Sequence, residues 1–149
     1  MMDIDSDTFS PLSSDELAGV AGGSRNFVAG DSIAVGVASQ LHWAHDAKVG
    51  APSKDIIHRV PHGHFHFLVL SAGSNDPMNP HLADNLNAMR RRAGGGVLWI
   101  APVNAHARAV VTRVAHEHGD QVVTFTPGHD HIHPRSYAEL AHRIQHAMY

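Results

Sequence analysis

The sequence predicts an α/β fold: a five-stranded parallel sheet with helices on both faces, arranged as a three-layer α/β/α sandwich. The first observation is that short apolar runs alternate with segments whose apolar residues recur at helical spacing. The second is that continuous apolar runs are typical of strands buried on both faces of a parallel sheet. Right-handed crossovers place helices on each face, and the strand order that we expect is the flavodoxin-like 2-1-3-4-5.

Five segments have the apolar character of strands. They cover residues 27–31, 47–50, 65–71, 97–102 and 121–126. Five further segments carry apolar residues at helical spacing. They cover residues 34–44, 52–60, 80–93, 103–118 and 134–148. For the third helix we expect Asn79 as the N-cap and Pro80 as the first helical residue.

Composition narrows the function classes. A chain of 149 residues fits one domain, and 43% hydrophobic residues suffice for a normal core. The formal net charge of −3 and the lack of a basic stripe argue against nucleic-acid binding. The absence of cysteine excludes disulfides and thiol catalysis. No apolar run approaches the ~20 residues that a membrane span needs.

The chain has 15 histidines, several of them clustered at residues 58–66 and 129–133. Clustered imidazoles can hold a metal, whereas a histidine-rich surface can also be simply solvated. We expect no metal and no other cofactor. Metal-dependent hydrolysis through His62, His64, His66 or the loop around Asp130 is the competing hypothesis.

Polar loops follow four of the predicted strands, at residues 30–32, 49–53, 72–76 and 128–134. In sheets of this kind the carboxyl ends of the strands form the site. That edge would then hold a serine, an asparagine, aspartates and histidines, which is the inventory for acyl transfer. Ser32 comes where a strand ends and a helix begins, so backbone N–H groups there favour a developing negative charge. Taken alone, Ser32 is more simply interpreted as an ordinary helix cap.

Four short motifs, taken together and in order, resemble those of the SGNH hydrolases, also called GDSL esterases and lipases. They are Gly30-Asp31-Ser32-Ile33, Gly50 within Val-Gly-Ala-Pro-Ser, Gly73-Ser74-Asn75-Asp76, and Asp130-His131-Ile132-His133-Pro134. The resemblance spans residues 27–146. It implies a serine ester hydrolase with a catalytic triad. The mature chain is short for this family, so we expect an open site suited to small acyl groups, such as acetyl on a carbohydrate, and no large lipid pocket.

The resemblance also implies individual roles. Ser32 would be the nucleophile, His133 the general base and Asp130 the residue that orients His133. The oxyanion would accept hydrogen bonds from the backbone N–H groups of Ser32 and Gly50 and from the side-chain amide of Asn75.

Three more residues in these motifs, Asp31, Gly73 and Asp76, are expected to support the loops of the site. From the residues alone, His129 and His131 are the nearest competitors of His133 for the role of base.

The first 23 residues resemble a double-glycine leader peptide of bacteriocin-type export substrates. The pattern is carried by Leu12, Ser13, Glu16, Leu17, Val20, Gly22 and Gly23. It implies that the cysteine-peptidase domain of an ABC transporter cuts after Gly23 and that residues 24–149 are secreted as the mature hydrolase domain. The segment lacks the basic region and long apolar stretch of a general secretory signal. The alternative is an ordinary N-terminal helix.

Two functions therefore follow from the sequence. The first is an exported serine esterase whose partners are a small-molecule or glycan ester and the leader-processing transporter. The second is a secreted binding or antagonistic protein that has the same fold but no catalysis. The sequence does not identify the acyl group, the alcohol or the oligomeric state.

Overall fold

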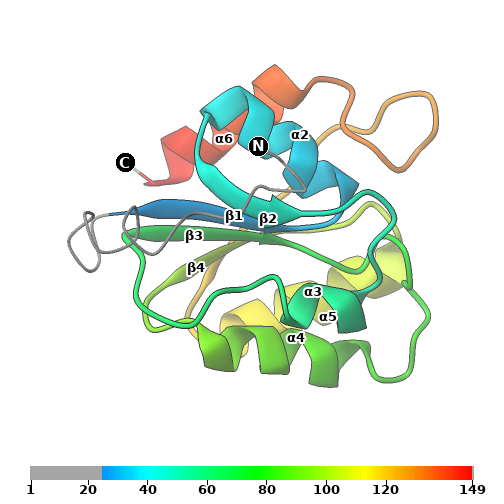
Figure 1. Cartoon of the computed structure of the whole chain (residues 1–149). Helices are drawn as coiled ribbons and strands as arrows, with labels where there is room; N and C mark the ends of the chain where they lie inside the picture. Colours follow the sequence, from blue (N-terminus) through cyan, green and yellow to red (C-terminus); the bar gives the residue numbers. More distant parts are fainter. Residues whose placement is uncertain (1–24, 149) are drawn as a thin grey trace.

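The computed structural model describes residues 25–148 and has the predicted α/β architecture (Figure 1). Its five strands all pair in parallel, in the order β2-β1-β3-β4-β5. They are β1 (Asn26–Gly30), β2 (Ala44–Ala47), β3 (Phe67–Ser71), β4 (Val97–Ile100) and β5 (Gln121–Val123). The predicted fold class and strand order are confirmed.

Helices cover both faces of the sheet, as Figure 1 shows. On one face lie α2 (Ser32–Leu41) and α6 (Tyr137–Met148). On the other lie α3 (Ser53–Ile57), α4 (Leu82–Arg92) and α5 (Ala105–Glu117). In the described part of the chain, none of these helices has the length and apolar character needed to cross a membrane.

The alternation of side chains along the strands divides the core into two layers. Under α3, α4 and α5, residues such as Leu70 and Trp99 pack against Met89. Under α2 and α6, Val69 packs with Ile33 and Ile144. The central strands are thus buried on both sides, which explains their continuous apolar sequences.

The second strand lies earlier in the chain than predicted. The prediction put a helix over residues 34–44 and a strand over 47–50, but α2 ends at Leu41 and β2 is Ala44–Ala47. The cause is His42, which adopts a left-handed conformation with φ of 58° and caps the helix through a backbone hydrogen bond to Ala38. The chain therefore turns back toward β1 several residues sooner.

The prediction of Asn79 and Pro80 as the start of the third helix was wrong. The Asn79 side chain accepts a hydrogen bond from the backbone N–H of His81, and its carbonyl accepts one from Leu82, so these residues form a turn. The helix begins only at Leu82. Elsewhere β3 starts two residues late, β4 and β5 end early, and α6 begins at Tyr137 instead of residue 134.

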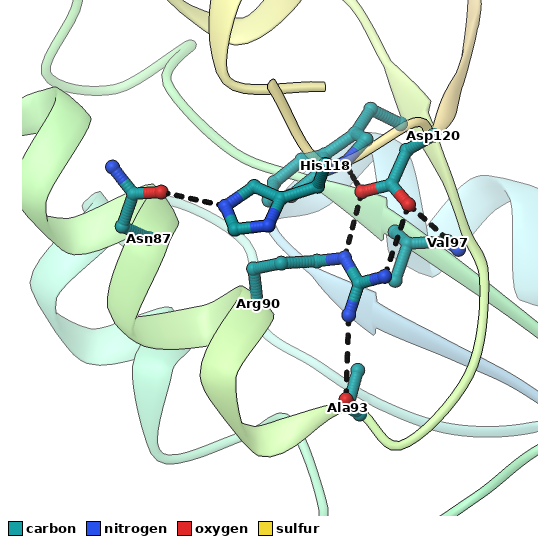
Figure 2. Close-up of polar contacts among 7 residues, drawn as sticks. Asn87, Arg90, Ala93, Val97, His118 and Asp120 are labelled. Carbon is teal, nitrogen blue, oxygen red and sulfur yellow. Dashed lines mark hydrogen bonds and ion pairs between the residues drawn. The ribbon is translucent and has the colours of Figure 1, made fainter. Parts of the chain in front are cut away.

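A buried ion pair between Arg90 and Asp120 lies at the amino-terminal edge of the sheet (Figure 2). Asp120 accepts hydrogen bonds from Arg90 Nε (2.7 Å) and Nη2 (3.1 Å) and from Trp99 Nε1 (3.0 Å). The side chains of Arg90 and Asp120 are only 15% and 1% exposed. Arg90 lies on α4 and Trp99 on β4, so the carboxylate joins a helix to the sheet at the edge opposite the polar loops.

We predict that Asp120→Ala lowers the free energy of unfolding by about 3–5 kcal/mol, because it leaves the buried Arg90 charge and the Trp99 N–H without their acceptor. Urea denaturation measures the loss. Glu139→Ala is the control, since its ion pairs with Arg135 and Arg143 are exposed and should contribute little to stability. Equal losses in the two variants would contradict the prediction.

Candidate active site

The turn that carries Ser32 depends on a glycine whose backbone conformation leaves no room for a side chain beside the neighbouring strand. At Gly30, the last residue of β1, φ is +149°, and a Cβ there would lie 2.1 Å from the carbonyl oxygen of Ser71 on β3. Only glycine fits this position. The next residue, Asp31, donates its backbone N–H to the same Ser71 oxygen at 3.2 Å. Ser32 then begins α2 at the carboxyl edge of the sheet.

Asp31 is fully buried and fixes the first turn of α2. Its Oδ1 accepts hydrogen bonds from the backbone N–H of Ile33 (3.1 Å) and from the Ser71 hydroxyl (2.9 Å). This is an N-cap of the kind that aspartate provides, tied in addition to β3. Burial raises the pKa of Asp31 to about 6, although its hydrogen bonds act in the opposite direction. The side chain thus supports the position of Ser32.

A chain of hydrogen bonds runs from Ser32 through His133 to Asp130. The Ser32 Oγ lies 2.8 Å from His133 Nε2, and His133 Nδ1 lies 2.5 Å from Asp130 Oδ2. With Asp130 ionised, Nδ1 is the protonated nitrogen, so Nε2 is the acceptor for the Ser32 hydroxyl. The structure thus brings together the three residues for which the sequence predicts a triad.

The Asp130 carboxylate is held in its ionised form by its own loop. Besides the His133 side chain, its Oδ1 accepts hydrogen bonds from the backbone N–H groups of Ile132 and His133, both at 2.9 Å. The hydrogen bond from the His133 side chain, followed by those from the backbone, keeps the pKa of Asp130 well below its usual range. The carboxylate is therefore charged at neutral pH and can stabilise a protonated His133.

The other two histidines of this loop point elsewhere. His129 and His131 are exposed, whereas His133 is half-buried and contacts Ser32. His131 has a left-handed backbone with φ of 59°, and its N–H bonds the Gly128 carbonyl, which makes the loop turn on itself. The geometry thus selects His133 as the partner of Ser32.

The two remaining predicted oxyanion donors lie on neighbouring loops. Asn75 donates one amide N–H to the Ala51 carbonyl at 3.0 Å, which leaves its second N–H for another acceptor. Gly50 has φ of +81°, and a Cβ there would meet no atom within 4 Å. Glycine is therefore favoured here by the positive φ, and not by a steric clash with neighbouring atoms. Lys48 donates its N–H to the Gly30 carbonyl at 3.0 Å, so this loop adjoins the Ser32 turn.

Asp76 joins these two loops. Its carboxylate accepts hydrogen bonds from the backbone N–H of Ser53 (3.0 Å), the Ser53 hydroxyl (2.5 Å) and the Asn79 amide (2.9 Å). Ser53 is buried and also accepts a hydrogen bond from Asn85. Ser53 and Asn85 were not predicted as supporting residues, because a serine after Pro52 is typical of an exposed helix start and Asn85 belongs to no motif.

Gly73, the third supporting residue, has φ of +103° in the loop that follows β3. Side chains are rarely stable in this conformation, so glycine is needed for the turn that leads to Asn75. The supporting residues that the sequence predicts thus hold the site loops through side-chain hydrogen bonds at Asp31 and Asp76 and through the backbone conformation at Gly73.

The candidate site is open to solvent. Val49, next to Gly50, is 70% exposed, and Ile132, next to His133, is 46% exposed. A hollow of about 700 Å³ follows the His133 loop and is lined by residues 127–131 and 133–135. Large apolar side chains remain uncovered beside the predicted oxyanion donor and base, so nothing in the described chain forms a lid over them.

Among residues 25–148, no three histidine or acidic side chains are grouped closely enough to hold a metal ion. The predicted leader, with Gly22 and Gly23, lies outside the described residues.

We predict that the raised pKa of Asp31 makes stability depend on pH. The folded state binds a proton more tightly than the unfolded state, whose carboxyl has the ordinary value of 3.8, so the contribution to stability falls as pH rises through about 4 to about 6. Asp31→Asn keeps the cap but cannot ionise. The free energy of unfolding of the parent, minus that of Asp31→Asn, should therefore fall by roughly 3 kcal/mol from about pH 3 to about pH 7. A pH-independent difference would contradict this prediction.

No protein-family model matches the chain, and no curated protein matches it significantly. Among solved structures, the chain is similar to the C-terminal catalytic domain of Streptococcus pneumoniae peptidoglycan O-acetyltransferase A (OatA), determined with a methylsulfonyl adduct. The sequences are 17% identical, the TM-score is 0.44, and the match covers 65% of this chain and 62% of that domain. The match thus spans less than two thirds of that chain. At this sequence identity and TM-score, the similarity supports no conclusion about function.

Proposed function

We propose that this protein is a serine esterase of the SGNH type that hydrolyses small acyl esters, with acetyl esters of carbohydrates as the substrate class. The observation that supports this most strongly is the hydrogen-bonded chain Ser32–His133–Asp130. It lies at the carboxyl edge of a parallel sheet, where the loops of Gly50 and Asn75 also converge. The four sequence motifs supply these same residues.

In the proposed reaction, the Ser32 Oγ attacks the ester carbonyl carbon while His133 Nε2 accepts the hydroxyl proton. The ionised Asp130 stabilises the imidazolium that forms. When the tetrahedral intermediate collapses, His133 returns the proton to the leaving alcohol and the acyl group stays on Ser32. A water molecule, deprotonated by His133, then attacks the acyl carbon. When this second tetrahedral intermediate collapses, the bond to Ser32 Oγ breaks, His133 returns the proton to Ser32 Oγ and the carboxylic acid leaves.

The negative charge of the tetrahedral intermediate would develop near three N–H donors. Ser32 is the first residue of α2, and the first N–H groups of a helix have no partner within it. The Gly50 N–H and the second N–H of the Asn75 amide complete the proposed oxyanion hole. Preorganised donors of this kind stabilise the transition state, and the helix dipole adds to their effect.

The openness of the site supports a small acyl group. Val49 and Ile132, the chain neighbours of Gly50 and His133, are exposed, and the hollow beside His133 is lined by residues of its own loop. An exposed site of this kind suits an ester that is attached to a larger polar molecule, such as a glycan.

We predict that Ser32→Ala lowers the hydrolysis of p-nitrophenyl acetate by at least ~10³-fold, because it removes the nucleophile. Asn75→Ala should retain the triad and lose about 10²–10³-fold in kcat. A spectrophotometric assay, supplemented by acetate release from acetylated sugars, gives both numbers. Circular dichroism shows whether the variants are folded.

Parental activity in Ser32→Ala would contradict the proposed esterase. Activity that chelators abolish would favour metal-dependent hydrolysis. A biological effect of the secreted protein that persists in Ser32→Ala would favour the non-catalytic binding function.

We also propose that the chain is exported after removal of residues 1–23. The fold is compatible with this cleavage, since β1 begins at Asn26, three residues after Gly23, and none of the five strands would be shortened. Mass spectrometry of the secreted protein should show Ser24 as the first residue when the transporter is present, and Gly22→Val should block processing. Intact Met1 in the medium would contradict the proposed cleavage.

A further inference from the structure

Gly36 lies in the middle of α2, where the helix itself gives no reason for a glycine. Gly36 lies inside Ser32–Leu41, where glycine costs about 1 kcal/mol relative to alanine. Unlike Gly30 or Gly50, it has no positive φ that would explain it. A Cβ on Gly36 would lie 2.2 Å from Cε1 and 2.5 Å from Cδ1 and Cζ of Tyr137. The glycine therefore makes room for the Tyr137 ring.

The two residues of this contact each follow a partner of the Ser32–His133 hydrogen bond by four positions. Gly36 follows Ser32 by four residues on α2, so the two lie on the same side of the helix, one turn apart. Tyr137 follows His133 by four residues and is the first residue of α6. Figure 1 shows α2 and α6 side by side on the same face of the sheet.

Tyr137 also lies near the two carboxylates that flank the candidate site. Burial raises the pKa of its hydroxyl first, and the charges of Asp31 and Asp130 raise it further. Asp31 caps the helix that carries Ser32, and Asp130 orients His133. The ring thus packs against the helix that carries the proposed nucleophile, and its hydroxyl lies within electrostatic reach of the loop that carries the proposed base.

The loop needs such a support, because the bonds that shape it are internal. Asp130 bonds the N–H groups of Ile132 and His133, and Gly128 bonds His133 through its backbone N–H at 2.9 Å. These bonds make the loop rigid but do not set its distance from α2. The side chains of His133 and Asp130 are 39% and 50% exposed, so they are only partly held by packing, whereas Pro134, the next residue, is buried.

We propose that Tyr137 is a positioning residue: its ring, seated on Gly36, holds the loop of Asp130 and His133 at hydrogen-bonding distance from Ser32. This inference rests on the proposed esterase function. The proposed positioning role depends on the aromatic ring of Tyr137 and not on its hydroxyl. It also requires the loop to move as one unit when the contact is lost, so that the His133–Asp130 pair persists while the Ser32–His133 contact lengthens.

The test uses Gly36→Ala, whose methyl group displaces the ring, together with Tyr137→Phe and Tyr137→Leu, in the full chain. Misplacement of catalytic groups by about 1 Å can cost about 10²-fold in rate. For Gly36→Ala and Tyr137→Leu we expect kcat on p-nitrophenyl acetate to fall about 10²-fold, with KM changed by less than about 3-fold. Tyr137→Phe keeps the ring and should keep parental kcat.

Two further readouts separate positioning from general damage. The midpoint of the pH profile of kcat/KM should stay in place in Gly36→Ala while its amplitude falls, because the His133–Asp130 pair is retained. The double variant Gly36→Ala/Tyr137→Leu should be no slower than either single variant, because both remove the same contact. Ile144→Val, in the same core layer under α6, is the control, and it should alter stability without altering kcat.

The outcomes are distinct. If the parent shows no Ser32-dependent activity, the proposed function fails. If the parent is a Ser32-dependent esterase but folded Gly36→Ala or Tyr137→Leu retains its kcat, the positioning role alone is overturned. If Gly36→Ala does not fold, the comparison of Tyr137→Leu with Tyr137→Phe decides. Loss of kcat in Tyr137→Phe would assign the role to the hydroxyl and overturn the inference as stated.

Discussion

The absence of a side chain at Gly30, where β1 lies beside Ser71 of β3, is the constraint on which the site depends. With no side chain there, the Ser71 carbonyl can contact the backbone of the turn, and the Ser71 hydroxyl can reach the Asp31 carboxylate. Asp31 in turn caps α2 and so sets the direction of the helix on which Ser32 lies. A side chain at residue 30 would push the strands apart and move the Ser32 hydroxyl away from its partners on distant loops.

The candidate site contains a buried and an exposed carboxylate, and the two have different roles. Asp31 lies inside the protein, where burial favours its neutral form and its role is to hold a helix. Asp130 lies at the surface, where hydrogen bonds keep it charged and it can balance a positive His133. The two environments explain how neighbouring aspartates support one serine in different ways. The buried Arg90–Asp120 pair fastens the opposite edge of the sheet, away from the proposed chemistry (Figure 2).

The sequence was sufficient to predict the strands whose local hydrophobic pattern agrees with their burial in the fold. The central strands are covered on both faces, so their apolar runs predicted them, and the order usual for a flavodoxin-like sheet predicted how they are arranged. Edge strand β2, with the sequence Ala-His-Asp-Ala, has no apolar run, and His42 ends α2 without the glycine that usually marks such an end. The motifs indicated the residues that meet at Ser32, but the Ser53–Asp76 bonds and the Tyr137 ring on Gly36 join segments far apart in the chain. Contacts of this kind leave no periodic signal in a sequence.

The central claim is that His133 and Asp130 activate Ser32 for attack on an acyl carbon. Labelling with a fluorophosphonate, which reacts with activated serines, tests it directly when the modified peptide is identified by mass spectrometry. We expect one label per molecule, on Ser32. Labelling should be lost in His133→Ala and strongly slowed in Asp130→Asn. Labelling of another serine, or equal labelling of Ser32 without His133, would contradict it.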